Sequence, residues 1–301
     1  MSRLHASRQY SLWMDLVHPE NTVTEELTRE ASGLKLESRH VGKPWGRTQL
    51  PGVFSTASSQ RVGEVWFIGD EHLPLLAKYL FTSENLSVQV HPNDEQARSR
   101  GLASGKAECW FVIDAEPGAR IGLGLRHEIS PDILRRAALD GSVEQLIAWH
   151  PVAPGDFFFV PPGTIHTIGA GISLLELQQN SDVTYRLYDY GRGRDLHLDD
   201  GIAVARCDRY PEQLFQSVDP ATDAVLVDGP HFTLVHSRCD ALQNRERLIL
   251  PIDGYAAIDD EIARPGECLL LREHQRLDSV EGRLLVAAAP PIETIHLRVA
   301  A

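Results

Sequence analysis

Short apolar runs separated by turn-forming residues fill most of the chain from about residue 34 onward. Glycine, proline, asparagine and aspartate bound these runs, and this pattern is typical of β-strands. The strands predicted before residue 200 include 62–67, 86–91, 109–113, 157–161 and 172–178. The strands predicted after residue 223 include 224–226, 232–236, 247–252, 268–271 and 283–287. The chain is therefore predicted to be mainly β.

One segment has helical rather than strand periodicity. Ser130, Pro131 and Asp132 have the residue order of a helix start. The apolar positions after them recur with helical spacing up to about residue 150. Gly141 interrupts this pattern, so we expect two short helices. Strands resume at Gly155.

The order of these elements predicts how the chain is divided into domains. The tract 208–223 contains two X-Pro pairs and has the composition of a connection. We predict a large first domain over residues 34–207, with a helical insertion at about 130–150. A smaller β-sandwich domain is expected over residues 208–301. Residues 1–33 are polar and mildly amphipathic, and we expect an N-terminal arm there.

Composition and charge narrow the classes of function. Acidic residues outnumber basic ones by 42 to 29, giving a formal net charge of −13, which argues against a protein that coats nucleic acid or anionic membranes. No run approaches the ~18 apolar residues of a membrane span, and the amino terminus lacks the apolar core of a secretory signal. The cysteines form no CxxC pair; they are Cys109, Cys207, Cys239 and Cys268. We expect a cytoplasmic monomer or homodimer with neither a nucleic acid nor a membrane as partner.

The strand predicted at 86–91 carries the first candidate chemistry. It alternates strictly, so Ser87, Gln89 and His91 share one face while Leu86, Val88 and Val90 share the other. The apolar face should contact a core. The polar face is expected to line either a cavity or the solvent.

Two further patterns place polar groups in the same way. Lys106, Glu108 and Trp110 share one face of their strand, although a Lys/Glu pair alone is most often an exposed ion pair. The run from Gly155 to His166 has the spacing G-x5-P-x-G-x2-H, which is similar to the second motif of cupin barrels. Its Gly and Pro residues are expected to form a sharp turn that directs His166 into the mouth of a barrel.

Together these patterns predict a metal site. The candidate ligands are Gln89, His91, Glu108 and His166. Two imidazoles and two side-chain oxygens suit a borderline divalent ion such as zinc. Two histidines with one carboxylate also describe a non-haem Fe(II) centre, so the ligand types alone leave the metal open. With an open coordination position, the ion could polarise a substrate oxygen.

Longer motifs connect the chain to a known family. They are KPWG (43–46), GEVW (63–66), LPLLAKYL (73–80), LSVQVHPND (86–94), GKAECWFVIDA (105–115), the run from FFFVPPGTIH to LYDYGR (157–192) and DLHLDD (195–200). Through these motifs, which cover about residues 40–200 in order, the chain resembles type I phosphomannose isomerases of the short bacterial form. The resemblance implies a cupin-type jelly-roll barrel followed by a smaller β domain. It also implies a zinc-dependent isomerase that interconverts mannose 6-phosphate and fructose 6-phosphate, with one zinc ion per chain.

The resemblance also implies roles for individual residues. The metal ligands of that family correspond to Gln89, His91, Glu108 and His166, the set already reached from strand faces and ligand chemistry. Its substrate-side residues correspond to Lys78, Lys106, Glu176 and Arg186.

An aldose–ketose isomerase must move a proton from C2 to C1 of the sugar through an enediol-type intermediate. Lys106 is eligible as the base, because burial beside a metal lowers the pKa of a lysine. Glu176 is the rival base, and the second proton-transfer group stays unassigned. Arg186 would stabilise the developing negative charge.

The phosphate group of such a substrate needs partners of its own. Lys78, Lys106, Arg186 and the hydroxyl of Ser87 are the candidates, and arginine offers the bidentate geometry that suits phosphate. Asp182, four residues before Arg186, is expected to orient that arginine.

Two other functions could use the same ligand set. An iron-dependent cupin oxygenase would need no phosphate-binding cations, so Lys106 and Arg186 count against it. A non-catalytic cupin that binds sugar phosphates would be favoured by a missing ligand, and the motifs keep all four. The chain departs from the usual family text at Arg47, where a second Gly is common, and in HPND. These departures bear on substrate preference and rate rather than on the ligands.

Overall fold

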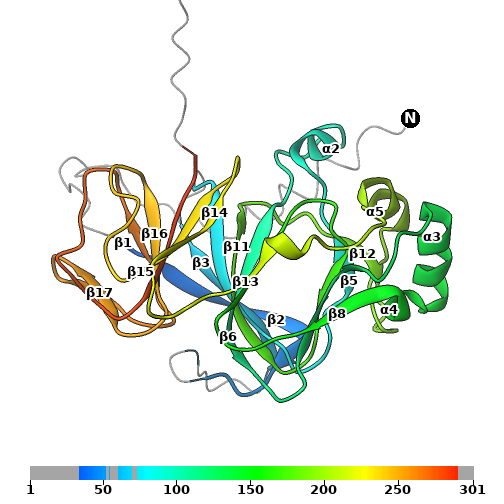
Figure 1. Ribbon diagram of the computed structural model, residues 1–301, viewed down its shortest axis with the longest axis horizontal. Helices are drawn as coiled ribbons and strands as arrows, with labels where there is room; N and C mark the ends of the chain where they lie inside the picture. Colours follow the sequence, from blue (N-terminus) through cyan, green and yellow to red (C-terminus); the bar gives the residue numbers. More distant parts are fainter. Residues whose placement is uncertain (1–33, 52–53, 55–59, 70–72, 291–301) are drawn as a thin grey trace, which may run out of the picture. The chain divides into compact units, whose positions relative to one another are not determined.

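The computed structural model describes residues 34–51, 54, 60–69 and 73–290. Strands make up most of its regular structure, as predicted (Figure 1). The predicted N-terminal arm, residues 1–33, lies outside the described residues. Within the described part of the chain, no helix is both long and apolar enough to cross a bilayer.

Two antiparallel sheets form the first part of the fold (Figure 1). The larger has, in spatial order, β13 (Phe215–Ser217), β9 (Asp156–Val160), β6 (Glu108–Ala115), β11 (Ile172–Gln179), β4 (Leu75–Phe81), β3 (Val62–Ile68) and β2 (Glu37–Arg47). The smaller has β12 (Tyr185–Tyr188), β5 (Val88–Val90), β10 (His166–Ile168), β7 (Arg120–Leu125) and β8 (Ile147–Pro151). Leu80, Trp110 and Phe158 of the larger sheet pack in one core with Ile121 and Ile168 of the smaller. Because the two sheets enclose this core, the predicted barrel is confirmed.

The predicted alternation of side chains holds for β6 and only partly for β5. Cys109 and Phe111 pack on the outer face of the larger sheet, whereas Trp110 packs inside the barrel. On β5, Val88 packs outside the barrel, as predicted. Leu86 was predicted on the same face as Val88, but it packs in the barrel core. The strand begins only at Val88, so its alternation does not extend to Leu86.

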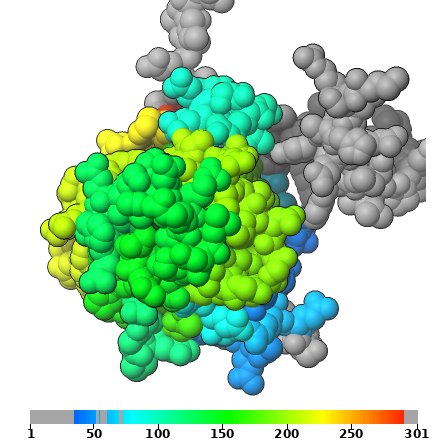
Figure 2. Space-filling view, turned by 90° about the vertical axis from the view of Figure 1, so that its right-hand side faces the viewer, coloured from blue at the N-terminus to red at the C-terminus, as the bar shows by residue number. Residues whose placement is uncertain are grey.

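Short helices cover the outer face of the five-stranded sheet. They are α3 (Pro131–Asp140), α4 (Val143–Leu146) and α5 (Leu198–Val204), while α2 (Asp94–Arg98) and the 3-10 turn η2 (Glu212–Leu214) lie elsewhere in the chain. Leu134 and Ala138 of α3 and Val204 of α5 share an apolar cluster with Val88 and Val90. Figure 2 shows this side of the molecule, with the α3–α4 segment in green at its centre. The helices therefore bury the apolar face of β5, which leaves its polar face for the barrel interior.

The helical insertion ends earlier than predicted. Ser130 caps α3, since its side chain accepts a hydrogen bond from the Ile133 amide, and Gly141 separates α3 from α4 as predicted. The helical pattern up to residue 150 was wrong beyond Leu146, because residues from Ile147 form β8. His150 of this strand pairs with Ile121 of β7. Pairing along the edge of the sheet thus overrides the local helical periodicity.

A pair of glycine substitutions tests how α3 ends. Gly141 has φ +83, and a Cβ placed there would lie 3.0 Å from the Tyr188 hydroxyl. Gly118 has nearly the same φ, +84, but open space around the Cβ position. We expect Gly118→Ala to lower the free energy of unfolding by about 1 kcal/mol through backbone strain alone. Gly141→Ala should cost about 1 kcal/mol more, because Tyr188 must move. Urea denaturation of both variants measures the difference, and equal losses would contradict the steric account.

Two more sheets form the C-terminal part of the fold. The larger has β1 (Leu34–Lys35), β19 (Leu269–Leu271), β16 (Arg247–Pro251), β21 (Leu284–Ala288), β15 (Thr233–Ser237) and β14 (Ala224–Asp228). The smaller has β18 (Glu261–Ala263), β17 (Tyr255–Ile258) and β20 (Ser279–Glu281). Ile249 and Val286 of the larger sheet pack against Ala256 and Ile258 of the smaller. The predicted small β-sandwich is confirmed.

Two strands cross the predicted boundary between residues 207 and 208. β1, at the start of the predicted first domain, pairs with β19 of the C-terminal sheet. β13, after the boundary, pairs with β9 of the barrel. An apolar cluster also joins Phe67 and Tyr79 of the barrel to Leu250 and Leu285. The division into a 34–207 domain and a 208–301 domain stays a prediction.

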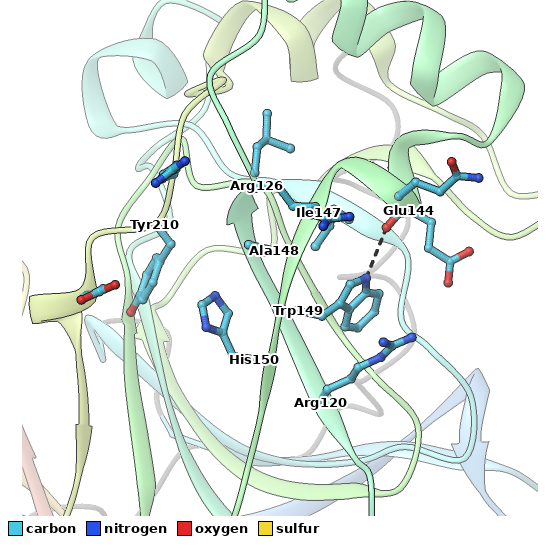
Figure 3. Close-up of a pocket in the computed structure, with 12 residues that line it drawn as sticks. Arg120, Arg126, Glu144, Ile147, Ala148, Trp149, His150 and Tyr210 are labelled. Atoms are coloured by element: carbon cyan, nitrogen blue, oxygen red, sulfur yellow. Dashed lines mark hydrogen bonds between the residues drawn. The ribbon is translucent and has the colours of Figure 1, made fainter.

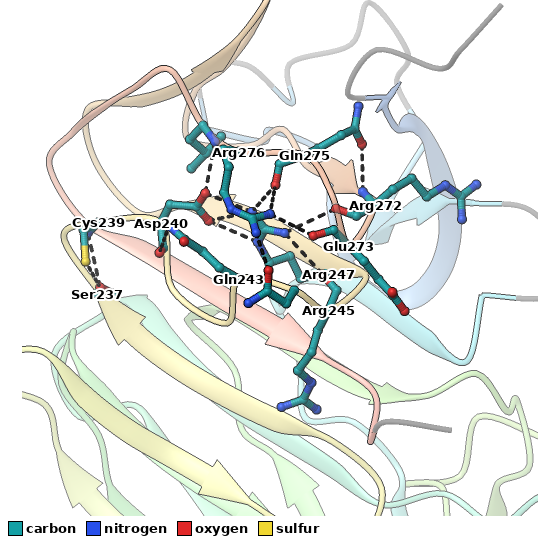
Figure 4. Close-up of polar contacts among 12 residues, drawn as sticks. Ser237, Cys239, Asp240, Gln243, Arg245, Arg247, Arg272, Glu273, Gln275 and Arg276 are labelled. Atoms are coloured by element: carbon teal, nitrogen blue, oxygen red, sulfur yellow. Dashed lines mark hydrogen bonds and ion pairs between the residues drawn. The ribbon is translucent and has the colours of Figure 1, made fainter. Parts of the chain in front are cut away.

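A buried arginine holds two loops of the C-terminal sandwich together (Figure 4). The Nη2 of Arg247 lies 2.7 and 2.9 Å from the two carboxylate oxygens of Asp240, and it donates to the Gln275 carbonyl at 3.0 Å. Arg247 is 1% exposed, so this charge is stabilised by its partners rather than by water. These polar contacts therefore stabilise the fold of the sandwich.

Candidate active site

Three potential metal ligands converge where the two barrel sheets meet. His91 follows β5, Glu108 begins β6 and His166 begins β10. The Glu108 carboxylate lies between the imidazoles, with Oε2 3.3 Å from His91 Nε2 and Oε1 3.3 Å from His166 Nε2. One ligand atom from each residue lies within 4.8 Å of the others, and all three residues are buried. The sequence separates these residues widely, and the sheets bring them together.

The turn before β10 fixes the orientation of His166. Gly163 has φ +85, and its amide donates to the His91 carbonyl at 2.8 Å, which joins the turn to the end of β5. His166 Nδ1 lies 2.9 Å from the Thr164 carbonyl, which can only accept, so Nδ1 carries the proton. The lone pair of Nε2 then faces the Glu108 carboxylate. Two facing lone pairs favour a cation between them, so the donor set fits a metal ion.

The protonation states of these residues also suit a metal. Burial and the Lys106 ammonium lower the pKa of His91 to about 3. Burial likewise lowers the pKa of His166. For Glu108, burial would raise the pKa, but the Lys106 ammonium, together with interactions with His91 and His166, outweighs burial and lowers the pKa well below its usual range. At neutral pH the group therefore offers two neutral imidazoles and one carboxylate, the forms that bind metals.

The fourth predicted ligand lies beside this group. Gln89 is opposite His166 in the pairing of β5 with β10, and its Nε2 lies 3.1 Å from His166 Nε2. Its Oε1 accepts a hydrogen bond from the Ser87 hydroxyl at 3.2 Å. A half-turn of the terminal amide would exchange these two atoms. The structure thus places Gln89 next to the three ligands, and its role as a ligand stays a prediction.

A chain of buried ion pairs continues from the metal ligands. The Lys106 ammonium lies 2.9 Å from Glu108 Oε2 and 3.6 Å from Glu176 Oε1. Lys78 lies 3.1 Å from the same oxygen of Glu176. Burial and the Glu108 charge raise the pKa of Glu176 to about 7, against the opposing effect of the two lysines. Glu176 can therefore exchange a proton near neutral pH.

A pocket of about 290 Å³ opens onto these residues. Of the predicted site residues it is lined by Lys78, Ser87, Gln89, Lys106, Glu176, Asp182 and Arg186. Arg186 is opposite Gln89 in the pairing of β12 with β5, and its Nε donates to the Asp195 carbonyl at 3.0 Å. Among the described residues, no hydrogen bond or ion pair joins Asp182 to Arg186, but the Asp182 charge acts on the guanidinium. Asp182 is exposed at the pocket, and its orienting role stays a prediction.

Four charged or aromatic residues of the pocket were not singled out from the sequence. They are Lys43, Trp45, Glu64 and Arg194. Lys43 and Trp45 lie in KPWG and Glu64 lies in GEVW, motifs that had carried only the family resemblance. Glu64 had a detectable signal, since it is an acidic residue in an otherwise apolar strand. Arg194 follows two glycines in a polar loop, where no periodicity marks it.

A larger groove, of about 930 Å³, lies elsewhere, over β7 and β8 (Figure 3). Arg120 stacks on the Trp149 ring, with 4.6 Å from guanidinium to centroid, and Trp149 Nε1 donates to the Glu144 carbonyl at 3.2 Å. This groove contains none of the predicted site residues. Since the metal-ligand group and the buried ion pairs adjoin the smaller pocket, that pocket is the candidate active site.

Several known proteins are similar to this chain. No family model matches the chain. The mannose-6-phosphate isomerase ManA of Bacillus subtilis is 37% identical over 234 residues, which cover 63% of this chain and 74% of that protein. The chain belongs to the mannose-6-phosphate isomerase family.

Other mannose-6-phosphate isomerases match over a shorter alignment or at lower sequence identity. The Streptococcus mutans protein is 42% identical over 170 residues, which cover 54% of this chain and 53% of that protein. The crystal structure of the mannose 6-phosphate isomerase from Bacillus subtilis superposes with a TM-score of 0.72 at 27% identity, covering 85% of this chain and 99% of that one. A variant of the phosphomannose isomerase from Salmonella typhimurium, at 14% identity, has a TM-score of 0.69 over 86% of this chain and 100% of that one, which shows the shared fold. The fold is that of these isomerases, as the cupin resemblance predicted.

Proposed function

We propose that this protein interconverts mannose 6-phosphate and fructose 6-phosphate, with one zinc ion per chain. Two relatives that share more than a third of the aligned residues carry the name mannose-6-phosphate isomerase. The observation that carries the proposal is the buried group of His91, Glu108 and His166 in contact with Lys106, which lines the pocket together with Glu176. A cytoplasmic location and a monomeric or homodimeric state stay predictions.

The metal in this proposal is held by Gln89, His91, Glu108 and His166. Their fit rests on the facing lone pairs of Glu108 and His166 and on the neutral state of both imidazoles. When bound, the ion supplies a Lewis acid that polarises the sugar oxygens at C1 and C2. Two histidines and a carboxylate would also accept iron, so the test below includes metal analysis.

Proton transfer in this proposal is shared between Lys106 and Glu176. An enediol-type intermediate forms when a base removes the C2 proton and an acid returns one to C1. Lys106 adjoins both the metal ligands and Glu176, so it lies where a sugar bound in the pocket would present these carbons. Glu176, with its pKa raised to about 7, can accept or release the proton near neutrality. Substitution of Lys106 distinguishes which of the two residues is the base at C2.

We assign phosphate binding and stabilisation of the developing negative charge to the other residues of the pocket. Arg186, Lys78 and the Ser87 hydroxyl line it, and Asp182 lies at its exposed side. Arg186 is the candidate for bidentate phosphate binding or for stabilising the developing oxyanion. Lys78 is already paired with Glu176, so its contribution to substrate binding is coupled to the protonation of that carboxyl.

Chelation tests the reaction class and the metal together. Formation of fructose 6-phosphate from mannose 6-phosphate is followed in a coupled spectrophotometric assay before and after treatment with a chelator. We expect turnover to be lost with the chelator and restored by one equivalent of zinc, because the buried donors favour a tightly held ion. No turnover with metal present would contradict the proposed isomerase. Iron in the elemental analysis, together with oxygen consumption, would instead favour an oxygenase.

A further inference from the structure

A row of paired residues crosses four strands of the larger barrel sheet. Trp66 of β3 is opposite Lys78 of β4, Lys78 is opposite Glu176 of β11, and Glu176 is opposite Trp110 of β6. Residues opposite each other in an antiparallel sheet project from the same face. The Lys78 ammonium therefore has Glu176 on one side and the β3 side chains on the other.

The β3 side of Lys78 is an ordered set of contacts. Its ammonium lies 5.6 Å from the centre of the Trp66 ring, a cation–π distance. The indole Nε1 of Trp66 donates to Glu64 Oε2 at 2.7 Å, and the same oxygen lies 3.2 Å from the Lys43 ammonium. Glu64 and Lys78 are only 6% and 5% exposed. Glu64 is thus a buried carboxylate fixed from two sides and close enough to act on Lys78 electrostatically.

Three carboxylates act on Lys78, those of Glu176, Glu64 and Glu108. The first two differ in how readily they take a proton. Burial raises the pKa of Glu176 to about 7, and the groups acting on it are Glu108 of β6, Lys106 just before β6, Lys78 of β4 and Glu64 of β3. Burial would also raise the pKa of Glu64, but Lys78, Lys43 and the Trp66 N–H outweigh burial and lower it. When Glu176 is protonated, Glu64 therefore remains an anion beside Lys78. A buried ammonium without such an anion would be strongly disfavoured.

We propose that Glu64, held by Trp66, is a positioning residue that keeps the Lys78 ammonium charged and in place while Glu176 exchanges its proton. This rests on the proposed function, in which Glu176 takes part in proton transfer. In this role Glu64 acts through Lys78.

Glu64→Gln is the direct test. Glutamine keeps the size of the side chain and an oxygen that can accept from Trp66 Nε1, but it removes the charge. We expect kcat/KM for mannose 6-phosphate to fall about tenfold, the size of effect that a lost charge-assisted interaction produces. We also expect Lys78 to react several times faster with acetic anhydride at about pH 9, followed by mass spectrometry of its peptide. The reason is that Glu64 raises the pKa of Lys78 against the effect of burial, so its loss leaves more neutral amine.

Two other variants make the result specific. Trp66→Phe keeps an aromatic face but removes the N–H, so a smaller change in the same direction is expected in both measurements. Glu84→Gln removes an exposed partner of Arg61, and both measurements should match the wild type. Thermal melting shows whether each variant is folded. If Glu64→Gln leaves either kcat/KM or the labelling of Lys78 unchanged, the positioning role is wrong. Because labelling needs no turnover, it decides this even if the wild-type protein fails to isomerise mannose 6-phosphate.

Discussion

His166→Ala is expected to lose stoichiometric metal and to lower isomerisation on the order of a thousandfold, which corresponds to about 4 kcal/mol. The substitution removes one of two imidazoles that face the Glu108 carboxylate. The remaining His91 and Glu108 would leave an incomplete set of ligands in a buried site. Metal content by elemental analysis and turnover in the coupled assay are the two measurements.

The matched control for this prediction is His150→Ala. His150 lies on β8 in the larger groove, away from the candidate active site (Figure 3). We expect it to keep both the metal and the activity, which shows that losing a histidine is not in itself damaging. Stoichiometric zinc in purified His166→Ala would show that the proposed ligand set is wrong.

Lys106→Met is expected to keep the metal and yet lower kcat by about 10²- to 10⁴-fold, the range over which a general acid or base contributes. Methionine fills a similar volume without an ammonium. Lys106 is not one of the proposed ligands, although its ammonium lies 2.9 Å from Glu108 Oε2 and 3.6 Å from Glu176 Oε1, so we expect its removal to affect proton transfer more than metal binding. Single-turnover kinetics with metal analysis separates these two effects.

Two further variants show what causes the loss of kcat in Lys106→Met. Lys106→Arg restores the charge but cannot act as a base, because a guanidinium does not lose its proton near neutrality. Recovery of activity in Lys106→Arg would assign Lys106 an electrostatic role and leave Glu176 as the base. Lys35→Ala removes a partly exposed lysine paired with Glu267 and should behave as the wild type. Full activity in Lys106→Met would contradict any part for this lysine in proton transfer.

Patterns local to one strand were sufficient to anticipate much of the site. The alternation around Glu108 placed Lys106 and Trp110 on the same face; Trp110 packs in the barrel core, and Lys106 lines the pocket beside Glu108. The turn spacing before His166 likewise indicated a histidine aimed inward. These predictions depend only on the two-residue period of a strand and on the geometry of Gly and Pro, so they require no knowledge of the tertiary contacts.

Features that depend on partners distant in the chain could not be predicted from the sequence. Residues 147–150 continue a helical pattern, but pairing of Ile147 with Leu125 turns them into a strand. Glu64 appeared only as an acid in an apolar strand, because its partner Lys43 approaches from another part of the sheet. The chain spacing also did not indicate that Arg186 donates to the Asp195 carbonyl, while Asp182 acts on it only electrostatically. Spacing along the chain did not indicate which of several nearby groups a long side chain would contact.

The pairing of β1 with β19 bears on how the chain folds during synthesis. Leu34 lies opposite Leu270, so the first strand described has its partner more than two hundred residues later in the chain. During synthesis on a ribosome, β1 cannot pair with β19 until nearly the whole chain has emerged. Contacts so distant in sequence slow folding and leave a strand edge open to wrong partners in the meantime. We therefore expect truncation just before β19 to yield aggregation rather than a shorter folded protein.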